Sequence, residues 1–198
     1  MNEQLWDKKL HISTMGRDDK RADVFRYPYE PTPYEVLIRL CESGYIHKEN
    51  ILVDYGCGKG RVGFFLNHEI GCRVTGVEYD ERIYDEAKLN LRSYKNPEDI
   101  RFVCMNAENF EVTDENAFYF FNPFSVEILK SVIRRILDSY YLSPREMHLF
   151  FYYPNDEYAS YLMNADELIF ECEITCGDLF KKSDDREKIL VFKIDSIA

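Results

Sequence analysis

One acidic residue and three glycines stand at regular spacing in the sequence: Asp54, Gly56, Gly58 and Gly60. Glycines in such a turn let the backbone approach a ligand closely and adopt positive φ without strain at Cβ. The apolar run 51–53 predicts a buried strand before the turn, and the apolar residues of 62–66 predict one face of a helix after it. A strand, a glycine turn and a helix form the opening unit of a nucleotide-binding α/β sheet.

The glycine turn has more than one candidate ligand. Residues 58–63 match G-x-G-x-x-G and Glu78 follows, which suggests a dinucleotide. The register argues against this ligand, because counting from Gly56 places Arg61 where the dinucleotide fingerprint needs a third glycine. Asp54 would also repel a pyrophosphate, whereas it can pair with an ammonium group. The sequence contains no GxxxxGK[ST] phosphate loop.

The hydrophobic pattern around this turn predicts five β-α units followed by a C-terminal β-hairpin, which indicates a largely parallel sheet with an antiparallel edge element. Strands are expected at 51–53, 73–78, 100–105, 117–121, 147–153, 168–175 and 189–194, and helices at 33–44, 62–69, 81–94, 126–140 and 157–163. Ligands of such sheets bind outside the carboxyl ends of the strands. We therefore expect one rim to collect residues 54–60, 78–79, 104–107, 122–124 and 152–155.

The spacing Asp-x-Gly-x-Gly-x-Gly at 54–60 resembles motif I of the class I S-adenosylmethionine-dependent methyltransferases. The segments YEPTPYEVLIRL, VTGVEYDERIYDEAKLNL, FFNPFS and LSPREMHLFFYYPN extend this resemblance over roughly residues 29 to 155. Together they are similar to a bacterial group of that family which is loosely similar to the non-SET histone-lysine methyltransferases. The resemblance implies a Rossmann-like α/β fold, with a seven-stranded, mostly parallel sheet, a C-terminal antiparallel hairpin and helices on both faces.

The resemblance implies S-adenosyl-L-methionine as cofactor and S-adenosyl-L-homocysteine as product. Asp54 would pair with the ammonium of the cofactor, and Glu78 would accept both ribose hydroxyls. Tyr79 would pack on the adenine ring, which residues 106–107 would contact. The full set of expected cofactor-binding residues is Asp54, Tyr55, Gly56, Cys57, Gly58, Gly60, Arg61, Glu78, Tyr79, Asn106, Ala107 and Asn122. No metal site is expected, because the six cysteines lack histidines or a second cysteine pair nearby.

The acceptor is expected at Asn122-Pro123-Phe124, which follows the fourth strand. This triplet resembles the Asn/Asp-Pro-Pro-aromatic motif of amino-group methyltransferases, with one proline instead of two. The alternative interpretation is a plain strand-to-helix turn, in which Pro123 stops the strand and Ser125 caps the helix. The resulting expectation is transfer of a methyl group to a nitrogen (or oxygen) of an unidentified small molecule or protein side chain.

Aromatic and polar residues near the same rim are candidates for the acceptor pocket or a lid: Tyr29, Thr32, Tyr34 and Tyr152. Aromatic faces suit a sulfonium or an amine through cation–π attraction. Residues 1–32 are charge-rich and carry Pro28 and Pro31 near their end, so we expect an N-terminal arm or lid before a single cofactor-binding domain at 33–198. A solvated arm is the alternative to a lid.

The overall composition limits the classes of acceptor and the cellular location that we expect. Lys and Arg number 25 against 36 Asp and Glu, a net charge of −11, which argues against nucleic acid as the acceptor. No secretory signal and no apolar run near the ~20 residues of a membrane span is evident, so we expect a cytoplasmic protein. Two other functions stay open: a cofactor-binding module without transferase activity, and an NAD-dependent oxidoreductase. The sequence sets no oligomeric state.

Overall fold

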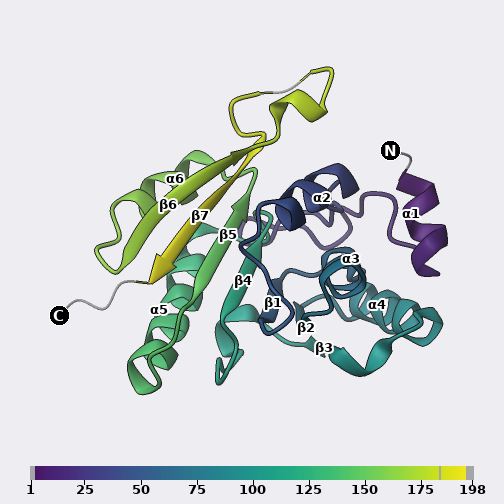
Figure 1. Ribbon diagram of the computed structural model, residues 1–198, viewed down its shortest axis with the longest axis horizontal. Helices are drawn as coiled ribbons and strands as arrows, with labels where there is room; N and C mark the ends of the chain where they lie inside the picture. The colour runs from purple at the N-terminus through teal and green to yellow at the C-terminus, as the bar shows by residue number, and fades with distance from the viewer. Residues whose placement is uncertain (1–2, 183, 195–198) are drawn as a thin grey trace.

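The computed structural model describes residues 3–182 and 184–194 and contains a seven-stranded sheet with helices on both faces (Figure 1). The strand order is β3-β2-β1-β4-β5-β7-β6. The strands are β1 (Ile51–Tyr55), β2 (Arg73–Glu78), β3 (Ile100–Cys104), β4 (Ala117–Phe120), β5 (His148–Tyr152), β6 (Leu168–Thr175) and β7 (Lys188–Ile194). The predicted fold class, with seven strands and a mostly parallel sheet, is confirmed.

The C-terminal hairpin joins the sheet through its second strand. β7 pairs antiparallel with both β5 and β6, while β1 to β5 pair in parallel. The burial of the two strands is consistent with this order. Most residues of β7 are buried, whereas β6 has several exposed residues and forms the edge of the sheet. The hairpin therefore places the residues just before β7 beside the carboxyl end of β5.

Two hydrophobic cores lie on opposite faces of the sheet. The helices are α1 (Glu3–Leu10), α2 (Tyr34–Glu42), α3 (Arg61–Ile70), α4 (Glu81–Ser93), α5 (Val126–Leu142) and α6 (Asp156–Met163), with short 3₁₀ turns η1 (Pro97–Asp99), η2 (Ala107–Asn109) and η3 (Gly177–Leu179). Residues of α1 to α4 belong to one core, and residues of α5 and α6 to the other. Covering both faces is what a parallel sheet with buried strands requires.

The starts of two helices differ from expectation. The helix expected from Pro33 begins at Tyr34, with Pro33 in the N-cap position, and the Thr32 hydroxyl lies 3.1 Å from the Tyr119 hydroxyl. Ser125 does occupy the N-cap position of α5, but its side chain makes no capping hydrogen bond there. Both helices are therefore fixed by packing of their apolar faces more than by their caps.

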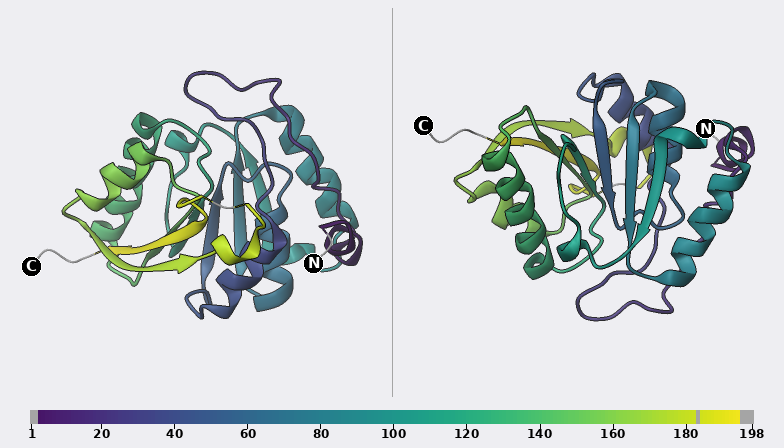
Figure 2. Two further views of the ribbon diagram at one scale, coloured as in Figure 1. Left: turned by 90° about the horizontal axis from the view of Figure 1, so that it is seen from above. Right: turned by 90° about the horizontal axis from the view of Figure 1, so that it is seen from below.

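The N-terminal segment packs onto the domain. Trp6 of α1 is buried, with its ring centroid 4.8 Å from that of Phe65 in α3. Asp7 accepts hydrogen bonds from Thr14 N (2.6 Å) and from the Tyr34 hydroxyl (2.6 Å). Figure 2 shows the segment that follows α1 looping past the end of the sheet before it reaches α2. The alternative of a fully solvated arm is therefore wrong for α1.

Candidate functional site

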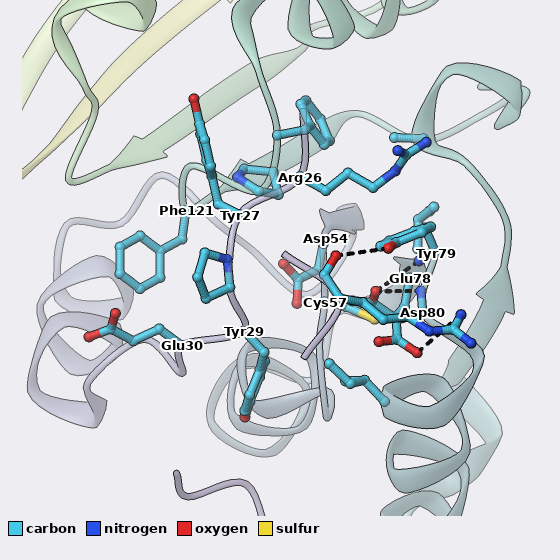
Figure 3. Close-up of a pocket in the computed structure, with 18 of the residues that line it drawn as sticks. Arg26, Tyr27, Tyr29, Glu30, Asp54, Cys57, Glu78, Tyr79, Asp80 and Phe121 are labelled. Atoms are coloured by element: carbon cyan, nitrogen blue, oxygen red, sulfur yellow. Dashed lines mark hydrogen bonds and ion pairs between the residues drawn. The ribbon is translucent and has the colours of Figure 1, made fainter. Parts of the chain in front are cut away.

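The carboxyl ends of β1 to β4 meet at one rim, and a first cavity lies there (Figure 3). The rim residues that line it are Asp54, Gly56, Cys57, Glu78, Tyr79, Met105, Asn106, Ala107, Pro123 and Phe124. The grouping predicted for the ends of the first four strands is thus found in the structure, whereas none of residues 152–155, also expected at this rim, lines this cavity. The segment 26–32 forms the other wall, since all seven of its residues line the same cavity.

The glycine turn is packed so tightly that side chains are excluded from it. A Cβ on Gly56 would lie 2.3 Å from Pro123 Cβ, and one on Gly58 would lie 2.1 Å from the Tyr29 ring. Both glycines have positive φ, 73° and 55°. The turn therefore brings backbone into direct contact with the end of β4 and with the N-terminal arm.

Asp54 is the chemically distinctive residue of this rim. Its side chain is buried, and its Oδ2 has no hydrogen-bond partner among the described residues. Burial, followed by the nearby charge of Glu78, raises the pKa of Asp54 to about 8. A buried carboxyl oxygen without a partner is costly unless a ligand satisfies it. An ammonium group would satisfy it, so the turn fits the amino-acid end of S-adenosylmethionine.

Glu78 is held by the backbone around it. Its carboxylate accepts hydrogen bonds from the N–H groups of Gly58 (3.0 Å), Tyr79 (2.9 Å) and Asp80 (2.8 Å). Burial raises the pKa of Glu78, and these three N–H groups oppose the rise. The side chain is thereby fixed between the glycine turn and the end of β2, the place that the ribose hydroxyls were expected to occupy.

The two residues expected at the adenine ring are both contacted by the arm. The Arg26 guanidinium lies 4.4 Å from the centre of the Tyr79 ring, and Arg26 Nη2 donates to Asn106 Oδ1 at 3.1 Å. The Tyr79 hydroxyl also donates to the backbone oxygen of Arg21. The arm therefore covers the end of the first cavity at which adenine was expected.

Arg61 fastens the arm to the glycine turn. Its side chain is 3% exposed, and it donates to Thr14 Oγ1 (2.7 Å) and to the backbone oxygen of Thr32 (3.1 Å). It also forms an ion pair with Glu3 of α1. Although Arg61 lines the first cavity, these contacts give it the role of an anchor for the segment above it.

A second cavity of about 680 Å³ lies beside the first. Four residues line both cavities: Tyr27, Pro28, Glu30 and Phe121. The other residues that line the second cavity are Arg17, Pro33, Asn122, Tyr152, Tyr153, Asn155, Phe180 and Glu187. Its volume lies within the ~300–1,000 Å³ of small-molecule sites.

Asn122 and Tyr152, both expected near the acceptor, line this second cavity. Asn122 has a φ of 39°, its Nδ2 donates to Tyr153 O (2.5 Å), and its Oδ1 accepts from Asn155 N (3.2 Å). It does not line the first cavity, although it was expected to bind the cofactor together with Asp54 and Glu78, which do. Tyr152 donates to Glu187 Oε2 at 2.8 Å.

Several predicted site residues line neither cavity. Tyr34 is fully buried against Trp6 and donates to Asp7, because the helix that starts at Tyr34 faces the core and not the rim. Tyr55 is buried in the opposite core, with its ring stacked 5.1 Å from that of Phe120. Gly58 and Gly60 shape the turn: Gly60 is the N-cap of α3 in the left-handed conformation.

Sequence reasoning missed Glu30, Phe121 and Glu187. Glu187 falls in a polar loop that carried no motif, and only the insertion of β7 beside β5 brings it to Tyr152. The segment that contains Tyr27 and Tyr29 is extended and proline-rich, so its alternating residues could have been predicted to face two different sites. Arg26 had no signal of its own.

The chain is similar to known methyltransferases in sequence and in fold. Residues 52–141 match the family model of the methyltransferase domain. A stretch of 66 residues, 33% of this chain and 3% of the relative, is 41% identical to a histone-lysine N-methyltransferase, H3 lysine-79 specific, of Dictyostelium discoideum. Another of 65 residues, 32% of this chain and 40% of the relative, is 32% identical to a protein-lysine N-methyltransferase of Saccharolobus islandicus strain REY15A. The chain thus spans well under half the length of either curated relative.

Among solved structures, the human methyltransferase 10 domain containing protein aligns with a TM-score of 0.61 at 13% identity, covering 97% of this chain and 93% of that one. This match supports the fold alone. The strand order is that of the class I S-adenosylmethionine-dependent methyltransferase fold, and motif I lies within the stretch that matches the methyltransferase domain. In the described residues, no helix is long and apolar enough to cross a membrane.

Proposed function

We propose that this protein transfers the methyl group of S-adenosylmethionine to a nitrogen of its acceptor. The observation that carries the proposal is the buried Asp54 oxygen without a partner beside the glycine turn. S-adenosylmethionine supplies an electrophilic methyl on a sulfonium and an ammonium that matches Asp54. NAD offers no primary ammonium for this position, and Arg61 replaces the glycine that a dinucleotide turn needs.

The residues of the rim orient the cofactor and exclude water from it. Asp54 and the backbone of the glycine turn would hold its amino-acid end, and Glu78 its ribose. In-line displacement at a methyl group needs alignment of nucleophile and methyl more than a strong base, and such positioning is worth up to several kcal/mol. The absence of a Cys–His or Ser–His pair from the predicted site is therefore consistent with the chemistry.

A nitrogen acceptor is supported by Asn122-Pro123-Phe124. Pro123 packs against Gly56 of the cofactor turn, while Asn122 lines the neighbouring cavity. The motif thus lies at the boundary between the two cavities. Asn122 Oδ1 accepts the Asn155 N–H, and an amide oxygen can accept a second hydrogen bond, here from an acceptor N–H. Both curated relatives are named as lysine N-methyltransferases, which supports a nitrogen acceptor.

The N-terminal arm is part of this proposal as a lid. With the arm in its observed position the first cavity measures about 90 Å³, below the ~300–1,000 Å³ of small-molecule sites. The contacts that hold the arm in this position include the Arg26 guanidinium over the Tyr79 ring and an ion pair of 3.5 Å between Asp18 of the arm and Arg82 of α4. Cofactor binding therefore requires residues 17–30 to move away from the rim and to repack around the bound molecule.

The test is release of S-adenosylhomocysteine from methyl-labelled S-adenosylmethionine in the presence of a pool of peptides and small amines. Labelled product that carries the methyl on nitrogen is expected, and Asp54→Asn should release less than a tenth as much product. Binding of the cofactor without product from any pool would instead indicate a binding module. Label found only on oxygen or carbon would contradict the choice of nitrogen.

A further inference from the structure

We infer that the second cavity binds the acceptor as an alkylammonium ion, with the Glu187 carboxylate as its ionic partner and aromatic rings as its walls. This rests on the proposed methyl transfer and specifies the acceptor class for it. The inference concerns residues from four separate parts of the chain: the arm, the end of β4, the end of β5 and the loop before β7.

The charge of the lining favours a cation. Its charged residues are Arg17, Glu30 and Glu187, and Arg17 Nη1 pairs with Glu30 Oε2 at 3.2 Å. Glu187 receives only the Tyr152 hydroxyl as a side-chain partner within residues 3–182 and 184–194. Its sequence neighbour Arg186 is paired with Asp184 at 3.0 Å and does not line the cavity. One carboxylate charge in the lining is thus left for a ligand to balance.

The walls of the cavity are aromatic. Tyr27 and Phe121 face it, and the Phe121 ring centroid lies 4.7 Å from that of the buried Tyr152. Tyr153 also lines the cavity, but Arg186 already lies 4.4 Å over its ring. A cation over an aromatic face gains about 0.5–1 kcal/mol at an exposed site and more when it is desolvated. Carboxylate and rings together therefore select a charged head on an apolar stem.

The position of the cavity suits an acceptor. Tyr27, Glu30 and Phe121 lie on one side of the arm in Figure 3, while Asp54, Cys57 and Glu78 lie on the other. The shared wall of the two cavities consists of this arm segment and Phe121. The second cavity is therefore the direct neighbour of the expected cofactor site, and the wall between them contains the part of the arm that acts as a lid.

The chemistry balances without another reactant. The bound ammonium loses a proton to water at the exposed rim of the cavity, where Arg17 and Glu30 lie. The freed nitrogen lone pair forms the N–C bond while the C–S bond breaks, and its electron pair stays on sulfur. The products are net-neutral S-adenosylhomocysteine and an N-methylated ammonium ion, which takes over the positive charge of the sulfonium and is again matched by Glu187.

The experiment uses the full chain without added cofactor, so that the arm lines the second cavity as in the structure, and two probes of equal length, n-pentylammonium chloride and n-pentanol, titrated by NMR line shifts. We expect pentylammonium to bind at least tenfold more tightly than pentanol. Glu187→Gln should weaken pentylammonium about fivefold and leave pentanol unchanged, because it removes the charge and keeps an oxygen for the Tyr152 hydroxyl. The matched control Glu49→Gln, an exposed residue before β1, should change neither.

Equal affinities for the two probes, or equal weakening of both by Glu187→Gln, would overturn the inference. Tyr27→Leu is the second variant if Glu187→Gln does not fold; it removes a ring at the surface and should weaken pentylammonium alone. These outcomes are separable from failure of the proposed function, which would appear as a lack of S-adenosylmethionine binding. Methyl transfer to free 1,5-diaminopentane or only to a lysine-containing peptide then distinguishes a small-molecule source of the ammonium from a protein one.

Discussion

Replacing Asp54 by Asn should change how stability depends on pH. In the folded chain burial raises the pKa of Asp54 to about 8, whereas an unfolded chain has an Asp pKa of about 3.9. Between these values the unfolded chain ionises this group and the folded chain keeps it protonated. The free energy of unfolding therefore falls as the pH rises, by about 1.4 kcal/mol for each pH unit from this group alone.

From pH 5 to pH 7 this group should remove about 3 kcal/mol of stability from the unsubstituted protein, a loss that Asp54→Asn does not suffer. The amide has its own cost, because the site gives Asp54 Oδ2 no partner and an unsatisfied NH₂ costs about 1–3 kcal/mol. That cost does not vary with pH. The informative quantity is the difference in unfolding free energy between the two proteins, which should shift by about 2–3 kcal/mol in favour of Asp54→Asn.

Urea unfolding at pH 5, 6, 7 and 8 measures this difference, with Asp138→Asn, an exposed aspartate of α5, as the matched control. Only Asp54→Asn should gain relative to the unsubstituted protein as the pH rises. If the difference in unfolding free energy stays constant between pH 5 and pH 7, Asp54 ionises normally in the folded chain. The argument that this buried carboxyl group binds an ammonium would then fail.

Three other perturbations test the rim. Glu78→Gln leaves one oxygen to accept three backbone N–H groups, so it should lower the free energy of unfolding by about 1–3 kcal/mol, measured in urea; no loss would show that these bonds are dispensable. Gly58→Ala adds a Cβ that clashes with the Tyr29 ring, at a position whose positive φ disfavours alanine. We expect a lower urea midpoint and weaker cofactor binding, and an unchanged midpoint would contradict the tight packing. Arg26→Ala frees the Tyr79 ring and should tighten S-adenosylmethionine binding about threefold in a fluorescence titration, whereas weaker binding would count against a lid that competes with the cofactor.

The sequence predicted the rim better than it predicted its surroundings. Asp54 and Glu78 end parallel strands, and parallel strands bring their carboxyl ends to one edge whatever the details of packing. The second cavity depends on β7 lying between β5 and β6, which is a long-range pairing that local pattern does not contain. Glu187 reaches Tyr152 only because of that pairing.

Tyrosines near the rim show the same limit. Tyr29 and Tyr34 are five residues apart in one proline-rich region, yet one lies on the glycine turn and the other in the core. The difference arises because α2 begins at Tyr34 and turns its first residue toward Trp6. Asp7 is buried and accepts three hydrogen bonds, which fix the arm at this point. No local sequence motif predicts these contacts.

Calorimetric titration of the full chain with S-adenosylmethionine, and separately with NAD⁺, tests the central claim most directly. The account predicts a saturable heat with one S-adenosylmethionine bound per chain. The affinity should fall as the pH falls below about 8, because Asp54 must be ionised to bind an ammonium. It predicts no saturable heat with NAD⁺. Saturable binding of NAD⁺ together with none of S-adenosylmethionine would contradict it.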